Sequence, residues 1–290
     1  TEPGKPSVKL EMLTYLVVND EWNSGHGGIS TFNRQICIAL AEYGHKVFCF
    51  IPRASQVDIA QAARFRVEIV TAKQYPGLTK YDLLARGPSD RTHIKADAVI
   101  GHDHITGAHA LALTRDEFNC PYLHFIHTSP EEIEPFKDTD EKREDGIVDY
   151  FKSSEKGKTQ ADLCAASDII LAVGPKLERS IRTNLAGKTD DERIISILPG
   201  LNQELLLYRR SLKYKHDLYC LMTGRLKETF IKGTDFFVRI AGDFQGTKVG
   251  PELRKVKFIM RGFDGATIND DVAKLVRLYK VTNVNIIARE

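Results

Sequence analysis

The amino-acid sequence predicts an α/β fold with two doubly wound domains, the second of them incomplete. Short apolar runs typical of strands alternate with amphipathic stretches typical of helices, which is the pattern of βαβ units around a mostly parallel sheet. The chain has 290 residues, about twice the length of a typical single domain. The strand and helix order restarts after a charged segment at 209–217, and we therefore expect domains at residues 1–205 and 206–290.

The first domain is expected to open with a strand at 11–18. After a glycine-rich segment, Phe32, Ile36 and Leu40 fall at helical spacing, and Gly44 ends this helix. The charged segment 130–158 indicates an exposed loop that leads into a helix. Further strands are expected at 47–51, 66–70, 98–100, 122–126, 168–173 and 193–198, and further helices at 107–114, from 162 onward and at 175–185.

The second domain is expected to begin after Pro199 and Gly200, which mark the exit from the first. A strand at 218–223, a helix at 235–241 and a strand at 256–260 repeat the order of a βαβ unit. The sequence ends before such a domain is complete.

Composition excludes several classes of protein. Hydrophobic residues make up 42% of the chain and charged residues 28%, as in ordinary globular proteins. Lysine and arginine number 41 against 39 aspartates and glutamates, and no basic stripe suggests nucleic-acid binding. No apolar run approaches the ~18 residues of a membrane span. The five scattered cysteines and a start without a signal-peptide pattern predict a reducing, cytoplasmic location.

A glycine-rich segment at 24–30 is the first candidate site. It follows a strand and opens a helix, so backbone N–H groups and the positive end of the helix dipole could face a phosphate or a sugar. Gly27 and Gly28 lie in this segment, but the dinucleotide pattern G-x-G-x-x-G is not present. A tight turn capped by Ser30 is the alternative interpretation.

A second candidate segment, 223–233, follows the strand that opens the second domain. Ligands of open α/β sheets bind beyond the carboxyl ends of the strands. Arg225 and Lys232 flank this loop and could together hold a diphosphate. The guanidinium of Arg225 would bind by two parallel hydrogen bonds, and the ammonium of Lys232 would act as a compact positive charge. Solvated surface charge is the alternative.

Histidines at two strand ends form the third candidate. His102 and His104 flank Asp103, and His127 precedes a polar turn where ligands of such folds bind. A His-x-His pair can bind zinc only with further ligands around it. For His127 a structural role in the sheet remains an equal alternative. The sequence shows no G-x-S-x-G elbow, no P-loop and no C-x-x-C pair, which disfavours those reaction classes.

The order of these segments resembles the retaining glycosyltransferases of the GT-B fold, which have two Rossmann-like domains. The resemblance is to glycosyltransferase family 4, the large family with sucrose synthases, glycogen synthases and bacterial mannosyltransferases. It covers nearly the whole chain. The matching segments are Gly27-Gly28-Ile29, Tyr43-Gly44-His45-Lys46-Val47, Val99-Ile100-Gly101-His102-Asp103, His124-Phe125-Ile126-His127-Thr128, residues 165–174, Ile197-Leu198-Pro199-Gly200, and Gly224-Arg225 through Lys232-Gly233.

The resemblance implies roles for individual residues. Gly27 and Gly28 would meet a nucleotide-sugar donor, with the backbone of Gly28 in contact. His127 would contact the donor sugar. Arg225 and Lys232 would neutralise the diphosphate as it leaves, so that neither a metal nor another cofactor is needed.

The resemblance further implies a hexosyltransferase that moves a sugar from a UDP- or GDP-sugar to an unknown acceptor. Asp103 would lie on the acceptor side. The family's paired-glutamate motif, with seven residues between the acids, does not follow 261–265. The alternative is therefore a catalytically inactive ligand-binding module of a larger interaction or signalling protein. A nicotinamide-dependent oxidoreductase ranks lowest, because the glycine spacing is wrong for it.

Overall fold

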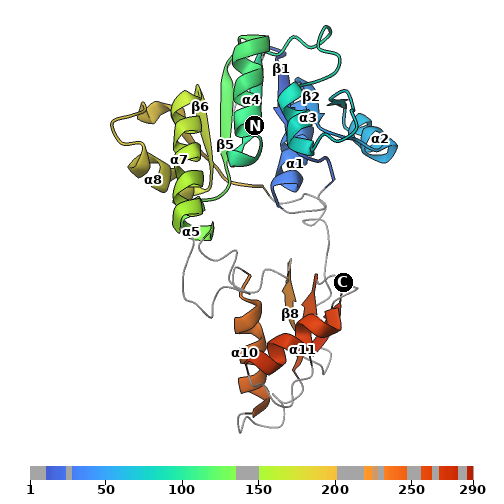
Figure 1. Cartoon of the computed structure of the whole chain (residues 1–290), viewed down its shortest axis with the longest axis vertical. Coiled ribbons are helices and arrows are strands. Elements are labelled where there is room, and N and C mark those ends of the chain that lie inside the picture. Colours follow the sequence, from blue (N-terminus) through green and yellow to red (C-terminus); the bar gives the residue numbers. More distant parts are fainter. Residues whose placement is uncertain are drawn as a thin grey trace, which may run out of the picture. The chain divides into compact units, whose positions relative to one another are not determined.

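The computed structural model describes residues 11–23, 28–134, 150–200, 219–224, 226, 232–246, 256–262, 268–279 and 286–289. The chain divides into two compact units (Figure 1). The first unit contains Thr1–Ser129 and Ser154–Gly200, and the second contains Pro130–Ser153 and Leu201–Glu290. The predicted domain boundary at 205–206 lies outside the described residues and stays a prediction.

A parallel sheet of seven strands, in the order β3-β2-β1-β4-β5-β6-β7, forms the centre of the first unit. The chain leaves β1 toward β3 and then returns to the other side of β1 through β4, so the winding direction reverses between β1 and β4. Ligands of open α/β sheets bind at this kind of reversal. The strands are β1 Thr14–Val18, β2 Lys46–Ile51, β3 Val67–Thr71, β4 Ala98–His102, β5 Tyr122–Ile126, β6 Ile169–Val173 and β7 Ile194–Ile197.

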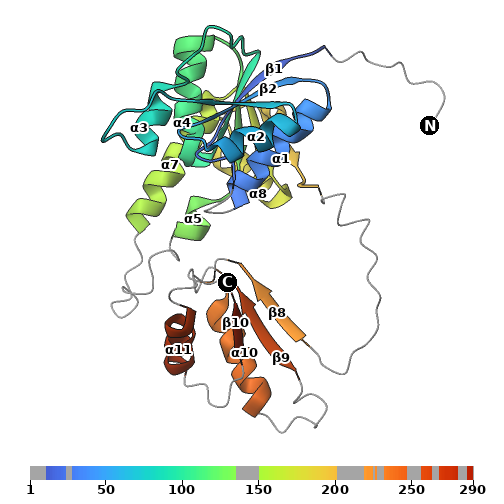
Figure 2. The same cartoon turned by 90° about the vertical axis from the view of Figure 1, so that its right-hand side faces the viewer.

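Helices cover both faces of this sheet (Figure 2). Two of them, α1 and α2, pack on one face, whereas α3 and α4 pack on the other beside α7 and α8. A π-helical turn at Thr114–Phe118 extends α4. The helices beside this sheet are α1 Gly28–Glu42, α2 Gln56–Arg64, α3 Lys80–Arg86, α4 Asp103–Leu113, α7 Tyr150–Ala166 and α8 Pro175–Asn184. The short helix α5 Pro130–Ile133 falls in the second unit.

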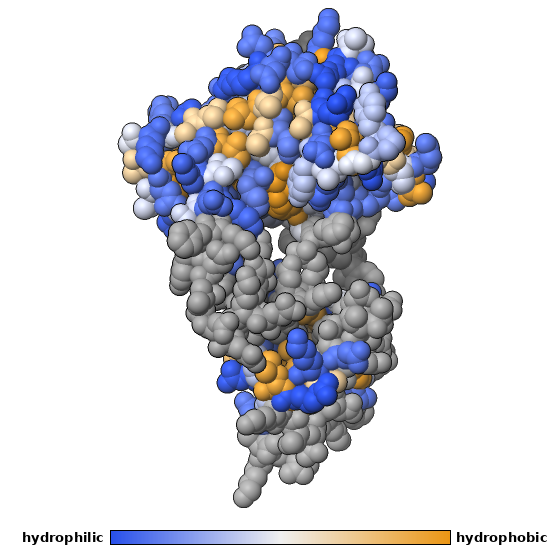
Figure 3. Space-filling model, in the orientation of Figure 1, coloured by the Kyte–Doolittle hydropathy of each residue, from blue (hydrophilic) through white to orange (hydrophobic). Residues whose placement is uncertain are grey.

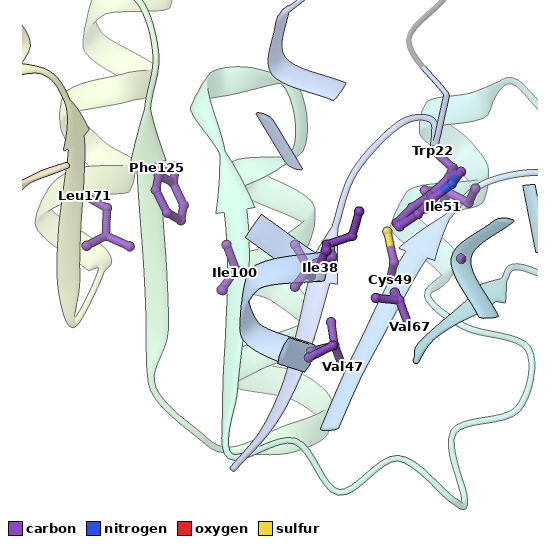
Figure 4. Packing of buried hydrophobic residues seen from close by; sticks show 13 residues of the cluster. Trp22, Ile38, Val47, Cys49, Ile51, Val67, Ile100, Phe125 and Leu171 are labelled. Atoms are coloured by element: carbon purple, nitrogen blue, oxygen red, sulfur yellow. The ribbon is translucent and has the colours of Figure 1, made fainter. Parts of the chain in front are cut away.

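Apolar side chains form one cluster on the sheet face under α1 and α2 and two clusters on the opposite face. Leu16 and Val18 of β1 point into a cluster on the opposite face and Val17 into the one under α1, and all three side chains are fully buried. Figure 4 shows the cluster under α1, where Ile38 of the helix lies over the strands. Full burial of such a side chain adds about 1.5–3 kcal/mol to the favourable free energy of folding. Burial on both faces explains why these strands are almost continuously apolar in sequence.

The second unit contains a smaller parallel sheet of three described strands, in the order β10-β9-β8. Its core consists of Leu226, Val238, Met260 and Leu275, which come from a loop, two helices and the central strand. The restart of the strand and helix order is thus confirmed. The elements are β8 Tyr219–Thr223, α10 Thr234–Gly246, β9 Lys257–Arg261, α11 Ile268–Leu278 and β10 Ile286–Arg289.

The surface of the first unit is mostly hydrophilic in the view of Figure 3, with an apolar strip over α4. Of the apolar residues near the end of α4, Ala108 and Ala112 are exposed and Leu111 is half-buried, whereas Ala110 and Leu113 are buried. Throughout the described part of the chain, no helix combines the length and apolarity that crossing a membrane would require.

Candidate functional site

Three segments meet at the carboxyl edge of the first sheet, near the reversal of winding. His102 is the last residue of β4, and His127 directly follows β5. The strands pair in parallel with His102 opposite Phe125, which brings the two histidines to the same edge. The first turns of α1 contact both histidines. This edge is where the fold places ligands.

A chain of hydrogen bonds links α1 to both histidines. The Asn33 Oδ1 atom lies 2.9 Å from His102 Nε2, and His102 Nδ1 lies 3.0 Å from His127 Nε2. Asn33 also donates from its amide nitrogen to the Cys49 sulfur at 3.6 Å. Asn33 and His102 are fully buried, whereas His127 is half-buried. The side chains of Asn33, His102 and His127 therefore form a continuous chain of hydrogen bonds, called the relay below, from the buried core to a half-buried position.

Aromatic rings hold the two imidazoles in place. The Phe32 ring meets the His127 ring edge to face, with 4.8 Å between centroids. Phe125 stacks on His102 at 5.4 Å and on His127 at 5.9 Å. Edge-to-face and stacked contacts of this kind favour one orientation of each imidazole ring.

The carboxylate of Asp103 holds the turn that follows β5. Its Oδ1 accepts from the backbone N–H of His127 at 2.8 Å, and its Oδ2 accepts from the Thr128 hydroxyl at 3.2 Å. Asp103 is fully buried and has a positive φ of 44°, a conformation that asparagine and aspartate adopt more readily than most residues. The buried carboxylate thus fixes the backbone position of His127.

Burial keeps these histidines uncharged. Desolvation lowers the pKa of His127 to about 4. For His102, burial first and the neighbouring His127 and His124 second lower the pKa well below its usual value. Both imidazoles are therefore neutral at neutral pH, and each carries a single ring proton.

Gly28 is the first residue of α1 at the same edge. A Cβ atom added to Gly28 would have no neighbour within 4 Å, so the space beside it is open. Asn23, which lies earlier in the chain, donates to Asp58 at 2.6 Å and accepts from Arg34 at 2.8 Å. Ser30, the alternative cap of this turn, donates its hydroxyl to Glu21 at 2.8 Å. Gly27 lies outside the described residues.

In the second unit, Lys232 is exposed and lies two residues before α10. The loop after β8 is anchored on both sides of Arg225, because Gly224 donates to Arg261 O at 3.1 Å and Leu226 donates to Gly262 O at 3.3 Å. The hydroxyl of Thr234, the first residue of α10, donates to Leu226 O at 3.3 Å. Arg225 itself lies outside the described residues.

The histidines of the first unit do not converge on one point. His124 lies on the opposite face of β5 from His127, where its Nδ1 is 2.6 Å from the Tyr122 hydroxyl. Within the described residues, no three His, Cys, Asp or Glu side chains are arranged to hold a metal ion.

Sequence reasoning did not single out Asn33 or the pairing of His102 with His127. The available signal was a polar residue within the apolar stripe of α1, beside Phe32 and Ile36. A buried asparagine requires hydrogen-bond partners, and these are found across the sheet in His102 and Cys49.

Two solved structures share this architecture, which is that of a GT-B glycosyltransferase. The glycosyltransferase from Rickettsia africae aligns with a TM-score of 0.58 and 14% identity, over 97% of this chain and 69% of that one. The α,α-trehalose-phosphate synthase from Burkholderia vietnamiensis aligns with a TM-score of 0.57 and 12% identity, over 96% and 72%. At such identities the likeness establishes the fold, and the predicted fold class is confirmed.

The sequence itself identifies the family. Residues 16–290 match the family described as "Family 4 Glycosyltransferase in conflict systems", and the chain belongs to it. The resemblance drawn from the ordered segments is thereby confirmed. No curated protein matches the sequence.

Proposed function

We propose that this protein transfers a sugar from a UDP- or GDP-sugar to an acceptor and that His127 contacts the donor sugar. The observation that carries the proposal is a half-buried, neutral histidine held at the carboxyl edge of the sheet, beside the start of α1. Membership of a glycosyltransferase family supports an enzyme over a silent binding module.

The start of α1 is suited to the donor by its backbone. Open space beside Gly28 allows a ligand to approach the chain closely, and Gly27 precedes it. The first N–H groups of a helix lack partners within the helix and carry a partial positive charge. These groups would attract the negatively charged part of a nucleotide sugar.

Arg225 and Lys232 would supply the positive charge that the reaction requires. When the sugar leaves its nucleotide, negative charge develops on the diphosphate, and fixed cations stabilise that charge. The exposed ammonium of Lys232, next to the start of α10, supports this role. We propose that the two side chains take the part of a divalent metal and that the anomeric configuration is retained.

The acceptor-side role of Asp103 remains a prediction. In the structure its carboxylate holds the turn at His127 and Thr128. A reducing, cytoplasm-like location is likewise proposed, because all five cysteines are free thiols.

The experiment that tests this function is incubation of the whole chain with UDP-glucose, UDP-N-acetylglucosamine, GDP-mannose and GDP-fucose, with calorimetry for binding and nucleotide release for turnover. At least one donor should bind and be hydrolysed or transferred. That activity should be lost in His127→Phe and retained in Lys274→Ala, which removes an exposed lysine from α11. Failure of all four donors to bind would overturn the proposal.

A further inference from the structure

The relay from Asn33 through His102 to His127 determines which ring nitrogen of each histidine carries a proton. The Asn33 amide nitrogen donates to Cys49, so its oxygen faces His102 Nε2 at 2.9 Å. A carbonyl oxygen only accepts, and His102 Nε2 must therefore carry a proton and donate it.

This proton assignment extends to the second histidine. His102 is neutral and has a single ring proton, which is at Nε2, so its Nδ1 is an acceptor. His127 Nε2 lies 3.0 Å from that Nδ1 and must therefore donate its own proton. Among the described residues, the hydrogen bonds of His127 are those of its Nε2 and its backbone N–H. Its Nδ1 is left without a proton, and the His127 side chain as a whole is half-buried.

We propose that Asn33 and His102 are positioning residues that fix His127 as the Nε2–H tautomer, so that His127 Nδ1 accepts a hydrogen bond from the ligand. The proposal rests on the proposed function for the role of His127 as a ligand contact. The tautomer itself follows from the relay and exists without any ligand.

The tautomer restricts what His127 can recognise. An unprotonated ring nitrogen attracts a hydrogen-bond donor, such as a sugar hydroxyl, and repels a phosphate oxygen, which has no proton to donate. His127 is therefore assigned to a hydroxyl of the donor sugar, and the diphosphate must be held by other groups. A sugar that lacks this hydroxyl leaves Nδ1 unpaired and binds more weakly.

The decisive experiment is long-range proton–nitrogen NMR of the whole chain labelled with nitrogen-15 in histidine, recorded at neutral pH without ligand. The His127 signals, identified by their loss in His127→Phe, should show a protonated Nε2 and an unprotonated Nδ1. A protonated Nδ1 in the wild-type chain would overturn the proposal.

The role of Asn33 is tested by removing its oxygen. In Asn33→Leu, His102 can move its proton to Nδ1 and donate to His127, whose own proton then moves to Nδ1. The unprotonated signal of His127 Nδ1 should lose at least half of its intensity. Asn33→Ala tests the same change without a bulky side chain. Tyr122→Phe removes another buried hydrogen bond from the same sheet, on its opposite face, and should leave the His127 signals unchanged.

The possible outcomes separate this proposal from the proposed function. If both Asn33 variants keep the wild-type tautomer, Asn33 does not set it and the proposal fails, whatever the donor assays show. If the tautomer is as assigned and no sugar nucleotide binds, the relay stands and the proposed function fails. For a donor that binds, replacing the contacted hydroxyl by fluorine should weaken wild-type binding about tenfold, and Asn33→Leu should reduce that difference.

Discussion

The start of α1 in the first unit and the start of α10 in the second are equivalent positions after the first strand of each sheet, yet they are built differently. At α1, the candidate ligand contact His127 is held by buried side chains, Asn33, His102 and Asp103. At α10, Lys232 is exposed, and the backbone N–H groups of Gly224 and Leu226 are bonded to Arg261 and Gly262. Under the proposed function, the first position orients a ligand contact and the second supplies charge. Substitution of the buried side chains at the first position should therefore cost stability, whereas substitution of the exposed Lys232 at the second should cost function alone.

The largest effect is expected for Lys232→Ala. Loss of a cation that stabilises developing charge should reduce kcat by about 100- to 1000-fold, the usual cost of losing one such group. The free energy of unfolding should change by less than about 0.5 kcal/mol, because Lys232 is exposed. Steady-state kinetics and chemical denaturation measure the two quantities.

Lys274→Ala is the matched control for that variant, since it removes one exposed lysine from the same unit. Its kcat should equal that of the wild type. Equal activity of Lys232→Ala and Lys274→Ala would contradict the assignment of charge to the α10 position.

Asp103→Leu should have the next largest effect, and on stability. It leaves the His127 N–H and the Thr128 hydroxyl without their acceptor and places a bulky residue at a φ of 44°. We expect a loss of about 2–4 kcal/mol in unfolding free energy, from the unpaired groups and the strain together. Asp103→Asn keeps one acceptor oxygen and tolerates the positive φ, so it should cost less than half as much in the same denaturation experiment. Equal losses in both variants would show that the carboxylate does not hold this turn.

Much of the fold could be predicted from the sequence, because buried parallel strands have a direct signature. The strand expected at 122–126 coincides with β5, and the helix expected from Pro175 coincides with α8 within one residue. The helices α2 and α3 were missed, although capping boxes at Ser55 and Thr79 mark their starts. The helix expected from 162 begins at Tyr150, because its first turns are too polar to show apolar periodicity.

The candidate site was predictable only in its outline. Placing His127 at a strand end follows from chain order, because parallel strands share one carboxyl edge. The contact between His102 and Asn33 does not follow from chain order, because 69 positions separate the two residues in the sequence. It depends on how α1 lies over the sheet. The conformation of Asp103 is equally hidden, since a positive φ leaves no pattern in a single sequence.

The two units should also respond differently to pH. Burial lowers the pKa of His127 to about 4 and, with a smaller effect of His127, that of His124 to about 3. The unfolded chain binds these protons near pH 6.5, so below that pH the unfolded state binds more protons than the folded state and stability falls. The loss should begin near pH 6.5, amount to at most about 1.4 kcal/mol per pH unit for each histidine, and level off below the folded pKa values.

Amide hydrogen exchange resolved by segment measures this difference, because the described residues of the second unit include no histidine. Between pH 6.5 and 4 the protection of β4 and β5 should fall more steeply than that of β8 and β9. His127→Gln and His124→Gln should each reduce the slope in the first unit. An equal slope in both units, unchanged by these variants, would show that the buried histidines do not control acid stability.

The smallest effect is expected for Gly28→Ala, which tests whether α1 contributes its backbone as well as a rigid frame. The added Cβ meets open space, so the free energy of unfolding should change by less than about 0.5 kcal/mol. Donor affinity should fall about tenfold, equivalent to roughly 1.4 kcal/mol, because the methyl group blocks close approach to the backbone. Gly101→Ala is the contrasting variant: its Cβ would lie 2.6 Å from the Ala110 Cβ and should cost about 1–3 kcal/mol of stability. Unchanged donor affinity in a stable Gly28→Ala variant would restrict the role of α1 to holding Asn33 and Phe32 against the histidines.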